Sequence, residues 1–143
     1  MVDLNLNIKN CRLSFLDLET TGLNVEQGDM ICEIGVFKVA DNQVMDKFHS
    51  LVNPQKTIPQ EAFRVHKISN QEVEFAPIFR ELADSLIDFL DGTVLCVYNV
   101  DFDLSFINYQ LQGLSKKPLN LPCIDILSMA RDMLTLPKYN LAT

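Results

Sequence analysis

Apolar residues in the first third of the chain come in short runs separated by turn-forming residues, a pattern typical of β-strands. Three strands are predicted, at residues 12–18, 30–40 and 43–52. Asp41 and Asn42 suit a tight hairpin turn between the second and the third. Pro54 and Pro59 then indicate a loop.

Further along, apolar residues recur every three or four positions, which marks one face of a helix. Residues 75–90 are predicted to be helical from Phe75, Phe79, Leu82, Leu86 and Phe89, with an end at Gly92. A second helix is predicted from Leu104, Ile107, Leu111 and Leu114, closed by Gly113 and Pro118. The continuous apolar run at residues 93–98 indicates a buried central strand. Residues 121–127 predict a last strand that leads into a short helix.

This order, three strands and then alternating helices and strands, predicts an α/β fold with a mixed sheet and helices packed on its faces. The chain of 143 residues, 48% hydrophobic and 22% charged, has the composition of one globular domain over residues 1–143. No apolar run is long enough to span a bilayer, and no signal peptide opens the chain, so a cytoplasmic location without membrane contact is expected.

The formal net charge is −7, from 12 basic and 19 acidic residues. Proteins that hold nucleic acid mainly by neutralising phosphates are usually basic, so this charge excludes a broad electrostatic binder. Any contact with nucleic acid must therefore be local, for example through bound metal ions.

The four cysteines are Cys11, Cys32, Cys96 and Cys123. None forms a C-x-x-C pair, and three lie in apolar runs. Free, buried thiols are therefore expected in place of a zinc site or a disulfide framework.

The first segment with candidate chemistry is Phe15 to Leu23, at the end of the first predicted strand. Asp17 and Glu19 are two positions apart, so both side chains point to the same face of an extended strand. Two buried carboxylates repel each other, and a divalent cation relieves that repulsion. An acid pair in solvent explains the spacing equally well. The following Thr20, Thr21 and Gly22 offer a turn whose N–H groups can meet a phosphate or a sugar.

The second segment, Tyr98 to Phe106, spans the end of the predicted central strand and the start of a helix. Ligands of open α/β sheets gather at such strand ends, although, for this segment taken alone, Asp101 or Asp103 more often simply caps the helix or complements its dipole. If adjacent strands carry the two segments, three carboxylates converge. A pair of metal ions at such a cluster can clamp the attacking and leaving oxygens of a phosphoryl displacement.

The two histidines and one further acid have structural explanations. His66 lies on a predicted loop, and a lone histidine is more often satisfied by its surroundings than catalytic. His49 lies in a predicted strand and is interpreted as structural. Asp125 is expected to be a helix cap or a strand-end residue.

Phe15 to Leu23 resembles the first motif of DnaQ-like 3′–5′ exonucleases of the DEDDh group, which includes the proofreading ε subunit of bacterial DNA polymerase III. Tyr98 to Phe106 resembles the second motif, usually His-Asn-Ala-x-Phe-Asp-x-x-Phe. Weaker signatures agree in order along nearly the whole chain: Glu33-Ile34-Gly35, Leu51-Val52-Asn53-Pro54, Ile58-Pro59, Ala62 with Val65-His66, and Cys123 to Arg131.

The resemblance implies a ribonuclease H-like fold with a five-stranded mixed sheet. It implies that Asp17, Glu19 and Asp103 are catalytic and bind two Mg²⁺ or Mn²⁺ ions. Substrate-binding residues implied in the same way are Thr20, Thr21, Leu23, His66, Asn99 and Phe102. The expected partner is a nucleic-acid 3′ end, single-stranded DNA rather than RNA, and a DNA polymerase subunit is suggested as well.

Three departures from the family pattern affect these expectations. Tyr98 replaces the usual His, and Lys67 replaces the usual Gly of the His-Gly-Ile loop. The family's final His-x-x-x-x-Asp motif, which supplies the general base and the last carboxylate, is absent, because no His follows His66 and no Asp follows Asp132. Residues 138–143 resemble the start of the preceding helix, which suggests a domain truncated before its C-terminal helix. The alternative is a catalytically inactive module that binds nucleic-acid ends or a protein.

Overall fold

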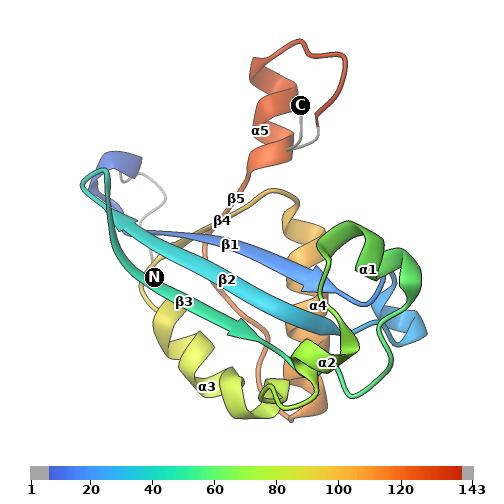
Figure 1. Ribbon diagram of the computed structural model, residues 1–143. Coiled ribbons are helices and arrows are strands. Elements are labelled where there is room, and N and C mark those ends of the chain that lie inside the picture. Colours follow the sequence, from blue (N-terminus) through green and yellow to red (C-terminus); the bar gives the residue numbers. More distant parts are fainter. Residues whose placement is uncertain (1–6, 140–143) are drawn as a thin grey trace.

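The computed structural model describes residues 7–139, and its centre is a five-stranded mixed sheet (Figure 1). The strands are β1 (Leu13–Thr20), β2 (Ile31–Ala40), β3 (Gln43–Leu51), β4 (Val94–Val97) and β5 (Cys123–Asp125). Their order across the sheet is β3-β2-β1-β4-β5. β2 pairs antiparallel with both β1 and β3. β4 pairs parallel with β1, and β5 pairs parallel with β4. The predicted α/β fold and mixed sheet are confirmed.

The hairpin between β2 and β3 turns at the two predicted residues. Asp41 and Asn42 have φ angles of 51° and 60°. Two successive positive φ angles are the signature of the type I′ turn, whose twist matches that of the flanking strands, and Asn and Asp tolerate this conformation best among non-glycine residues.

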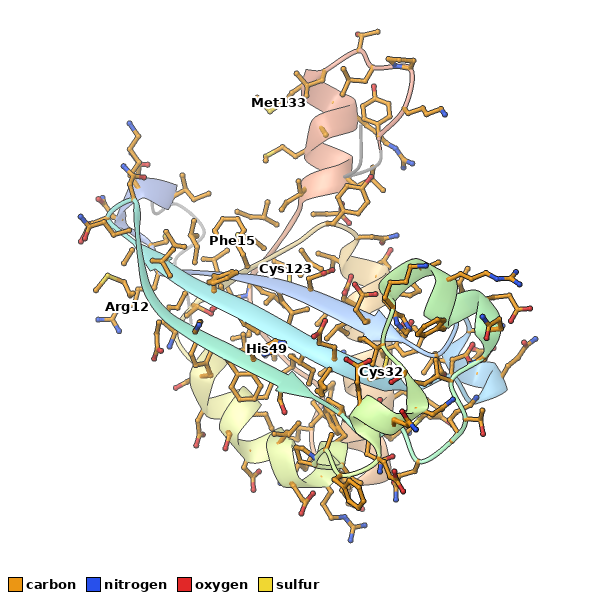
Figure 2. The ribbon with its side chains drawn as sticks, in the orientation of Figure 1. Arg12, Phe15, Cys32, His49, Cys123 and Met133 are labelled. Atoms are coloured by element: carbon orange, nitrogen blue, oxygen red, sulfur yellow. The ribbon has the colours of Figure 1, made fainter. Side chains whose placement is uncertain are left out.

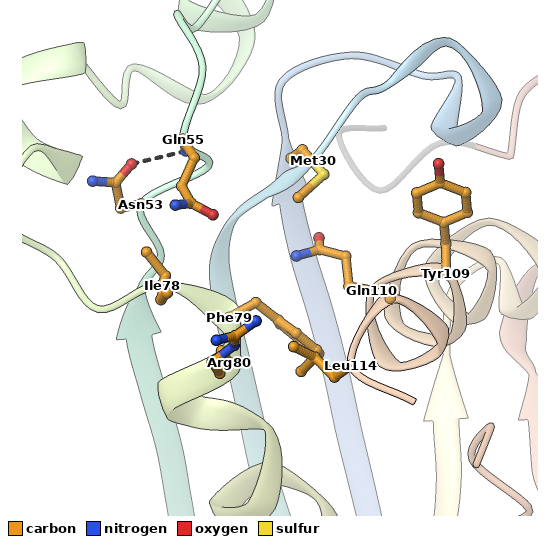
Figure 3. Close-up of a pocket in the computed structure, with 10 residues that line it drawn as sticks. Met30, Asn53, Gln55, Ile78, Phe79, Arg80, Tyr109, Gln110 and Leu114 are labelled. Atoms are coloured by element: carbon orange, nitrogen blue, oxygen red, sulfur yellow. Dashed lines mark hydrogen bonds between the residues drawn. The ribbon is translucent and has the colours of Figure 1, made fainter. Parts of the chain in front are cut away.

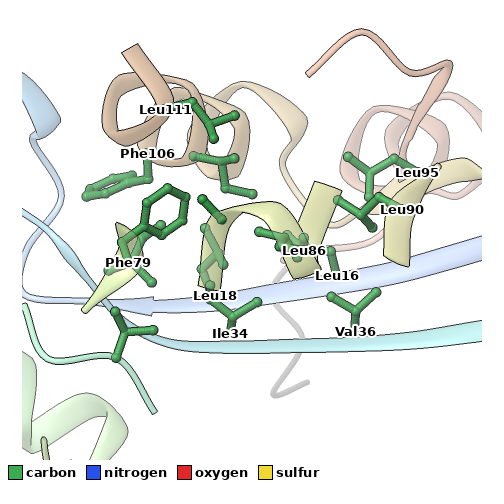
Figure 4. Close-up of a cluster of buried hydrophobic side chains, with 14 of the residues drawn as sticks. Leu16, Leu18, Ile34, Val36, Phe79, Leu86, Leu90, Leu95, Phe106 and Leu111 are labelled. Carbon is green, nitrogen blue, oxygen red and sulfur yellow. The ribbon is translucent and has the colours of Figure 1, made fainter. Parts of the chain in front are cut away.

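Two long helices, α3 (Phe79–Leu90) and α4 (Val100–Gly113), cover one face of the sheet. Their apolar sides meet the inward residues of the strands in one core (Figure 4). The core includes Leu16, Leu18, Ile34, Val36, Phe79, Leu86, Leu90, Leu95, Phe106 and Leu111. Leu16 and Leu18 alternate with the polar residues of β1, so the same pleat that buries the leucines turns Asp17 and Glu19 to the opposite face.

The first long helix begins later than its apolar spacing predicts, at Phe79 instead of residue 75. Pro77 disfavours helical dihedrals in the residue before it. The N–H of Ile78 is satisfied by the Glu81 carboxylate at 2.9 Å, which closes the helix start. Phe75 lies outside the helix and is 91% exposed, so the prediction that it belongs to the buried face is wrong.

The predicted loop after β3 contains two short helices, α1 (Gln60–His66) and α2 (Asn70–Val73). α2 starts with a capping box in which Ser69 and Glu72 satisfy each other's backbone N–H groups. A second, smaller apolar cluster, formed by Cys32, Ile58, Ile68 and Val73, fixes this segment against the start of β2. The loop indicated by Pro54 and Pro59 is present and ends where α1 begins at Gln60, but His66, which was expected on a loop, is the last residue of α1.

The last described elements are the short strand β5, three residues instead of the predicted seven, and α5 (Ile126–Met133). Asp125 caps α5 by accepting from the Ser128 N–H at 2.8 Å, as expected. α5 stands apart from the sheet, and Met133 projects into solvent (Figures 1 and 2). Residues 134–139 are not helical, and the expected helix start at residues 140–143 lies outside the described part.

The cysteines agree only partly with the prediction. All four are free; Cys32 and Cys96 are buried, but Cys11 is partly exposed and Cys123 is exposed at the sheet edge (Figure 2). Burial raises the pKa of Cys32 to about 12 and that of Cys96 to about 11, so both remain protonated thiols. None of the helices within residues 7–139 is long and apolar enough to cross a membrane.

Candidate active site

Strand β1 and helix α4 deliver the three predicted carboxylates to one end of the sheet. β4 pairs parallel with β1, with Leu16 opposite Val97, so the chain leaves β4 beside the end of β1. Asn99 then caps α4 by accepting from the Phe102 N–H at 3.5 Å. Asp103 therefore lies in the first turn of α4, and it is buried.

Mutual repulsion shows that the three carboxylates have converged. Burial, followed by the charges of Asp17 and Glu19, raises the pKa of Asp103 to about 7. A hydrogen bond from the Leu18 backbone N–H lowers the pKa of Asp17 and also that of Asp103. Both carboxyl groups therefore lie beside Leu18. Burial, followed by the charge of Asp17, raises the pKa of Glu19. This is the behaviour of an acidic cluster that lacks a counter-charge.

A fourth acid, Glu33 on β2, belongs to this neighbourhood although sequence reasoning gave it no role. It lies directly opposite Glu19 across the β1–β2 pair. Its charge raises the pKa of both Asp17 and Glu19, after the larger effect of burial. His49 on β3 approaches the Glu33 carboxylate at 2.9 Å, which gives this histidine a partner and agrees with its structural interpretation (Figure 2).

The donor set at this cluster suits a divalent cation. The described residues contain no group of three or more His, Cys, Asp or Glu side chains already arranged to hold a metal ion. Within residues 7–139, no ion pair involves Asp17, Glu19 or Asp103; the ion pairs are His49–Glu33, Lys56–Asp29 and Lys116–Asp84. Three carboxylates with raised pKa values and no ion-pair partner among the described residues have the chemistry of a divalent-cation site, because such cations take oxygen ligands.

The turn after β1 is held by its own side chains. Thr20 donates its hydroxyl to the Gly22 carbonyl at 2.6 Å, and Thr21 donates its hydroxyl to Asp29 at 3.1 Å. Thr21 also accepts from the Met30 N–H at 3.0 Å. A side chain at Gly22 would collide with the Asp29 carboxylate, so this position requires glycine. The threonine hydroxyl protons are used within the turn, which makes the turn rigid.

A cavity of about 480 Å³ opens between this turn and α1. Its lining includes Glu19 and five of the six residues that the resemblance implies for substrate binding: Thr20, Thr21, Leu23, His66 and Phe102. The sixth, Asn99, does not line the cavity and instead caps α4. Pro59, Ala62 and Val65 complete the apolar wall; they belong to the segment that the sequence predicted as a loop.

His66 is fixed in one tautomer by its neighbours. Its Nδ1 accepts the Ile68 backbone N–H at 3.0 Å, so Nδ1 carries no proton. The proton of the neutral ring therefore lies on Nε2, which donates to the Thr20 carbonyl at 3.2 Å and lies 3.7 Å from the Cys32 sulfur. Both ring nitrogens are occupied, so His66 joins α1 to the turn and has no free lone pair for a general base.

Lys67, which departs from the family's glycine, keeps the conformation that glycine would adopt. Its φ and ψ are 62° and 16°, in the left-handed region, and its N–H donates to the Phe63 carbonyl as the C-cap of α1. Lys67 thus adopts dihedrals that glycine tolerates more readily than lysine, at a cost in strain.

Comparisons with known proteins agree with this geometry. The model of the exonuclease family RNase T matches residues 14–142 of the chain.

The chain belongs to this exonuclease family.

Among related proteins, it is 35% identical over 139 residues to DNA polymerase III subunit epsilon of Rickettsia felis, covering 94% of the chain and 61% of that protein. It is 34% identical over 116 residues to the 3′-5′ exonuclease DinG of Bacillus subtilis, covering 81% of the chain and 12% of that protein. The chain thus spans about three fifths of the epsilon subunit.

Two solved structures of exonucleases have the same fold. Exonuclease X, in complex with 5′-overhanging duplex DNA, aligns with a TM-score of 0.68 at 25% identity, over 90% of this chain and 68% of that one. Apo exonuclease I aligns with a TM-score of 0.77 at 17% identity, over 85% of this chain and 30% of that one. The ribonuclease H-like fold expected from the resemblance is confirmed.

Proposed function

We propose that this chain is a 3′–5′ exonuclease domain that hydrolyses phosphodiester bonds at nucleic-acid 3′ ends. The observation that carries the proposal is the cavity of about 480 Å³, large enough for one nucleotide, whose wall includes Glu19 of the carboxylate cluster. A terminal nucleotide in this cavity would place its phosphate beside Asp17, Glu19 and Asp103. Membership of the exonuclease family supports the same reaction.

In this proposal Asp17, Glu19 and Asp103 hold two divalent ions, Mg²⁺ or Mn²⁺. When bound, such ions activate the attacking water and stabilise the leaving 3′ oxygen. The burial of Asp103 positions its carboxylate before the ions arrive, and its raised pKa shows how strongly the cluster favours added positive charge.

The walls of the cavity suit a single unpaired nucleotide. Leu23 and Val65 are 85% and 81% exposed at its rim, and Phe102 contributes an aromatic ring. Apolar side chains at these positions can pack against a splayed base without reading its identity. The net charge of −7 limits the number of phosphates that the protein can bind to a few. We therefore infer that the substrate is the end of a single DNA strand. By analogy with the epsilon subunits, the partner would be a DNA polymerase and the compartment the cytoplasm.

The described residues offer no free imidazole as general base. His66 is occupied at both nitrogens, and His49 lies against Glu33. We infer that the base and the last carboxylate come from a His-x-x-x-x-Asp segment, which residues 1–143 do not contain. Loss of a general base typically costs about 10²–10⁴-fold in rate. This chain alone is therefore expected to turn over very slowly.

The test is single-turnover digestion of a 3′-labelled single strand with Mg²⁺. It compares the 143-residue chain, a chain continued through a His-x-x-x-x-Asp segment, and Asp17→Ala in each. Fast digestion by the continued chain, abolished by Asp17→Ala, supports the proposal. Inactivity of the continued chain in both Mg²⁺ and Mn²⁺ would contradict it.

A second function, a catalytically inactive module that binds nucleic-acid ends, is favoured by one observation: His66, the histidine that lines the cavity, has both ring nitrogens occupied and no free lone pair for the general-base role. It predicts saturable binding of a 3′ end by the 143-residue chain, together with no cleavage by the continued chain. The same assay therefore separates the two functions.

A further inference from the structure

A second cavity, of about 350 Å³, lies on the helix side of the sheet (Figure 3). It is bounded by the start of α3, the last turn of α4 and the residues around the start of β2 and the end of β3. It shares no lining residue with the cavity beside the carboxylates. Gln110, which lines it, follows Asp103 by seven residues on the same buried side of α4, about 10 Å further along the helix axis.

Gln110 brings a side-chain amide to this cavity, with its oxygen paired and its nitrogen open. The residue is only 7% exposed, and its Oε1 accepts the Ile31 backbone N–H at 3.0 Å. The remaining amide nitrogen, Nε2, makes no hydrogen bond within the described part of the chain and faces the cavity in Figure 3. Nε2 is open to the cavity, so an acceptor atom of a ligand there can pair with it.

The other walls define the kind of ligand. Arg80, at the start of α3, is exposed and forms no ion pair with any residue between 7 and 139. Gln55 brings a second carboxamide to the opposite side of the cavity (Figure 3). Its backbone has a φ of 57°, and its N–H donates to the Asn53 side-chain oxygen at 2.8 Å. Phe79 and Met30 supply apolar surface. The cavity thus combines amide groups, flat apolar walls and one guanidinium.

We propose that this cavity binds a nucleoside monophosphate. Carboxamides bind the donor and acceptor edges of nucleobases, which assigns the base to the space between Gln55 and Gln110. A guanidinium binds phosphate with two parallel hydrogen bonds, which assigns the phosphate to Arg80. The volume falls within the range of small-molecule sites, roughly 300–1,000 Å³. The choice of ligand rests on the proposed function, because that reaction releases nucleoside monophosphates.

The experiment is an NMR titration of the ¹⁵N-labelled chain with dAMP in excess EDTA, which keeps divalent ions out of the carboxylate cluster. The Gln110 side-chain amide signals are the reporter, because only occupancy of this cavity places an acceptor beside Nε2. Arg80→Gln removes the cation at an exposed position. Gln110→Glu keeps the acceptor for the Ile31 N–H and the side-chain size but replaces the free donor with a carboxylate. Arg131→Gln, an exposed arginine on α5, is the matched control.

We expect saturable shifts of the Gln110 amide, at least about tenfold weaker binding in Arg80→Gln, and no change in Arg131→Gln. Deoxyadenosine and inorganic phosphate, titrated separately, are each expected to bind more weakly than dAMP. If phosphate alone binds as tightly, the cavity is only an anion site and the proposal is overturned. Unmoved Gln110 signals at millimolar dAMP, or equal binding by Arg80→Gln, would also overturn it.

These outcomes do not depend on hydrolysis. If the continued chain proves inactive while dAMP still shifts Gln110, the proposed function fails and the second site stands. If digestion proceeds and Gln110 does not respond, the second site fails alone. Gln110→Glu could lose its fold, but Arg80→Gln lies on the surface and keeps the test decisive.

Discussion

Replacing Asp103 by Asn should stabilise the metal-free protein above neutral pH. The substitution keeps the side-chain volume and an oxygen that can remain beside the Leu18 N–H, but it removes a charge that the fold buries beside Asp17 and Glu19. Asp103 is 6% exposed, so solvent screens little of this repulsion. The folded protein at pH 8 therefore carries a cost that the variant lacks.

The size of that cost follows from the pKa. Burial, with the charge of Asp17 next, raises the pKa of Asp103 from 3.8 to about 7. Each pKa unit corresponds to about 1.4 kcal/mol, so ionising Asp103 in the folded state costs about 4 kcal/mol as an upper value. Because the folded pKa is above the unfolded one, this contribution to stability is complete below pH 3.8 and is lost as pH rises through about 7. Asp103→Asn should remove this loss.

The assay is urea unfolding, followed by circular dichroism in EDTA, at pH values from 4 to 8.5. At pH 8 we expect the variant to be more stable by about 2–4 kcal/mol, and at pH 4 we expect the two proteins to agree. Asp101→Asn, in the exposed first turn of the same helix, is the control and should leave the pH profile parallel to that of the unaltered protein. If the profiles of Asp103→Asn and the unaltered protein are also parallel, Asp103 is not buried among like charges and the reasoning is refuted.

Three further substitutions test the packing and the strain, each by the urea midpoint. Lys67→Gly should stabilise by about 1 kcal/mol, since glycine adopts the φ of 62° without strain; a loss of stability would show that the Lys67 contact with the Phe63 ring at 5.8 Å matters more. Ser14→Ala should gain about 1 kcal/mol, because the buried Ser14 hydroxyl has no partner within the described residues; no gain would indicate a bound water there. Leu86→Ala should lose about 2–5 kcal/mol from the core, and a smaller loss would mean that the site collapses around the cavity.

The elements that the sequence predicted are those whose signals are local. Strand runs, the Asp41–Asn42 turn and the spacing of Leu82, Leu86 and Phe89 depend on neighbours a few residues away, and β1 to β4, α3 and α4 were located from them. The start of α3 was placed too early because spacing counts Phe75 and ignores Pro77. The capping box at Ser69 was a readable signal for α2 that apolar spacing does not contain.

The part of the candidate site that lies on a single strand or at a single helix start could be predicted from the sequence. The part that depends on the pairing register between strands could not. Two positions on one strand are enough to place Asp17 and Glu19 on one face. Glu33 joins them only because the antiparallel register sets it opposite Glu19, and that register depends on pairing along the whole of β1 and β2. Gln110 meets Ile31 across 79 residues of sequence, so its half-satisfied amide is a property of the folded chain alone.

The groups that a ligand could satisfy lie beside two of the described cavities, the one at the carboxylates and the one lined by Gln110. Asp103 is buried among like charges near one cavity, and Lys67 is strained directly after His66, which lines it. The free amide of Gln110 faces the other. Folding alone gains nothing from a buried like-charge cluster, which a cation would relieve, and the open Gln110 nitrogen can pair with an acceptor-bearing ligand. The same helix, α4, carries both groups on its buried side. Ligands at the two cavities should therefore stabilise the protein independently, and their effects on the free energy of unfolding should add.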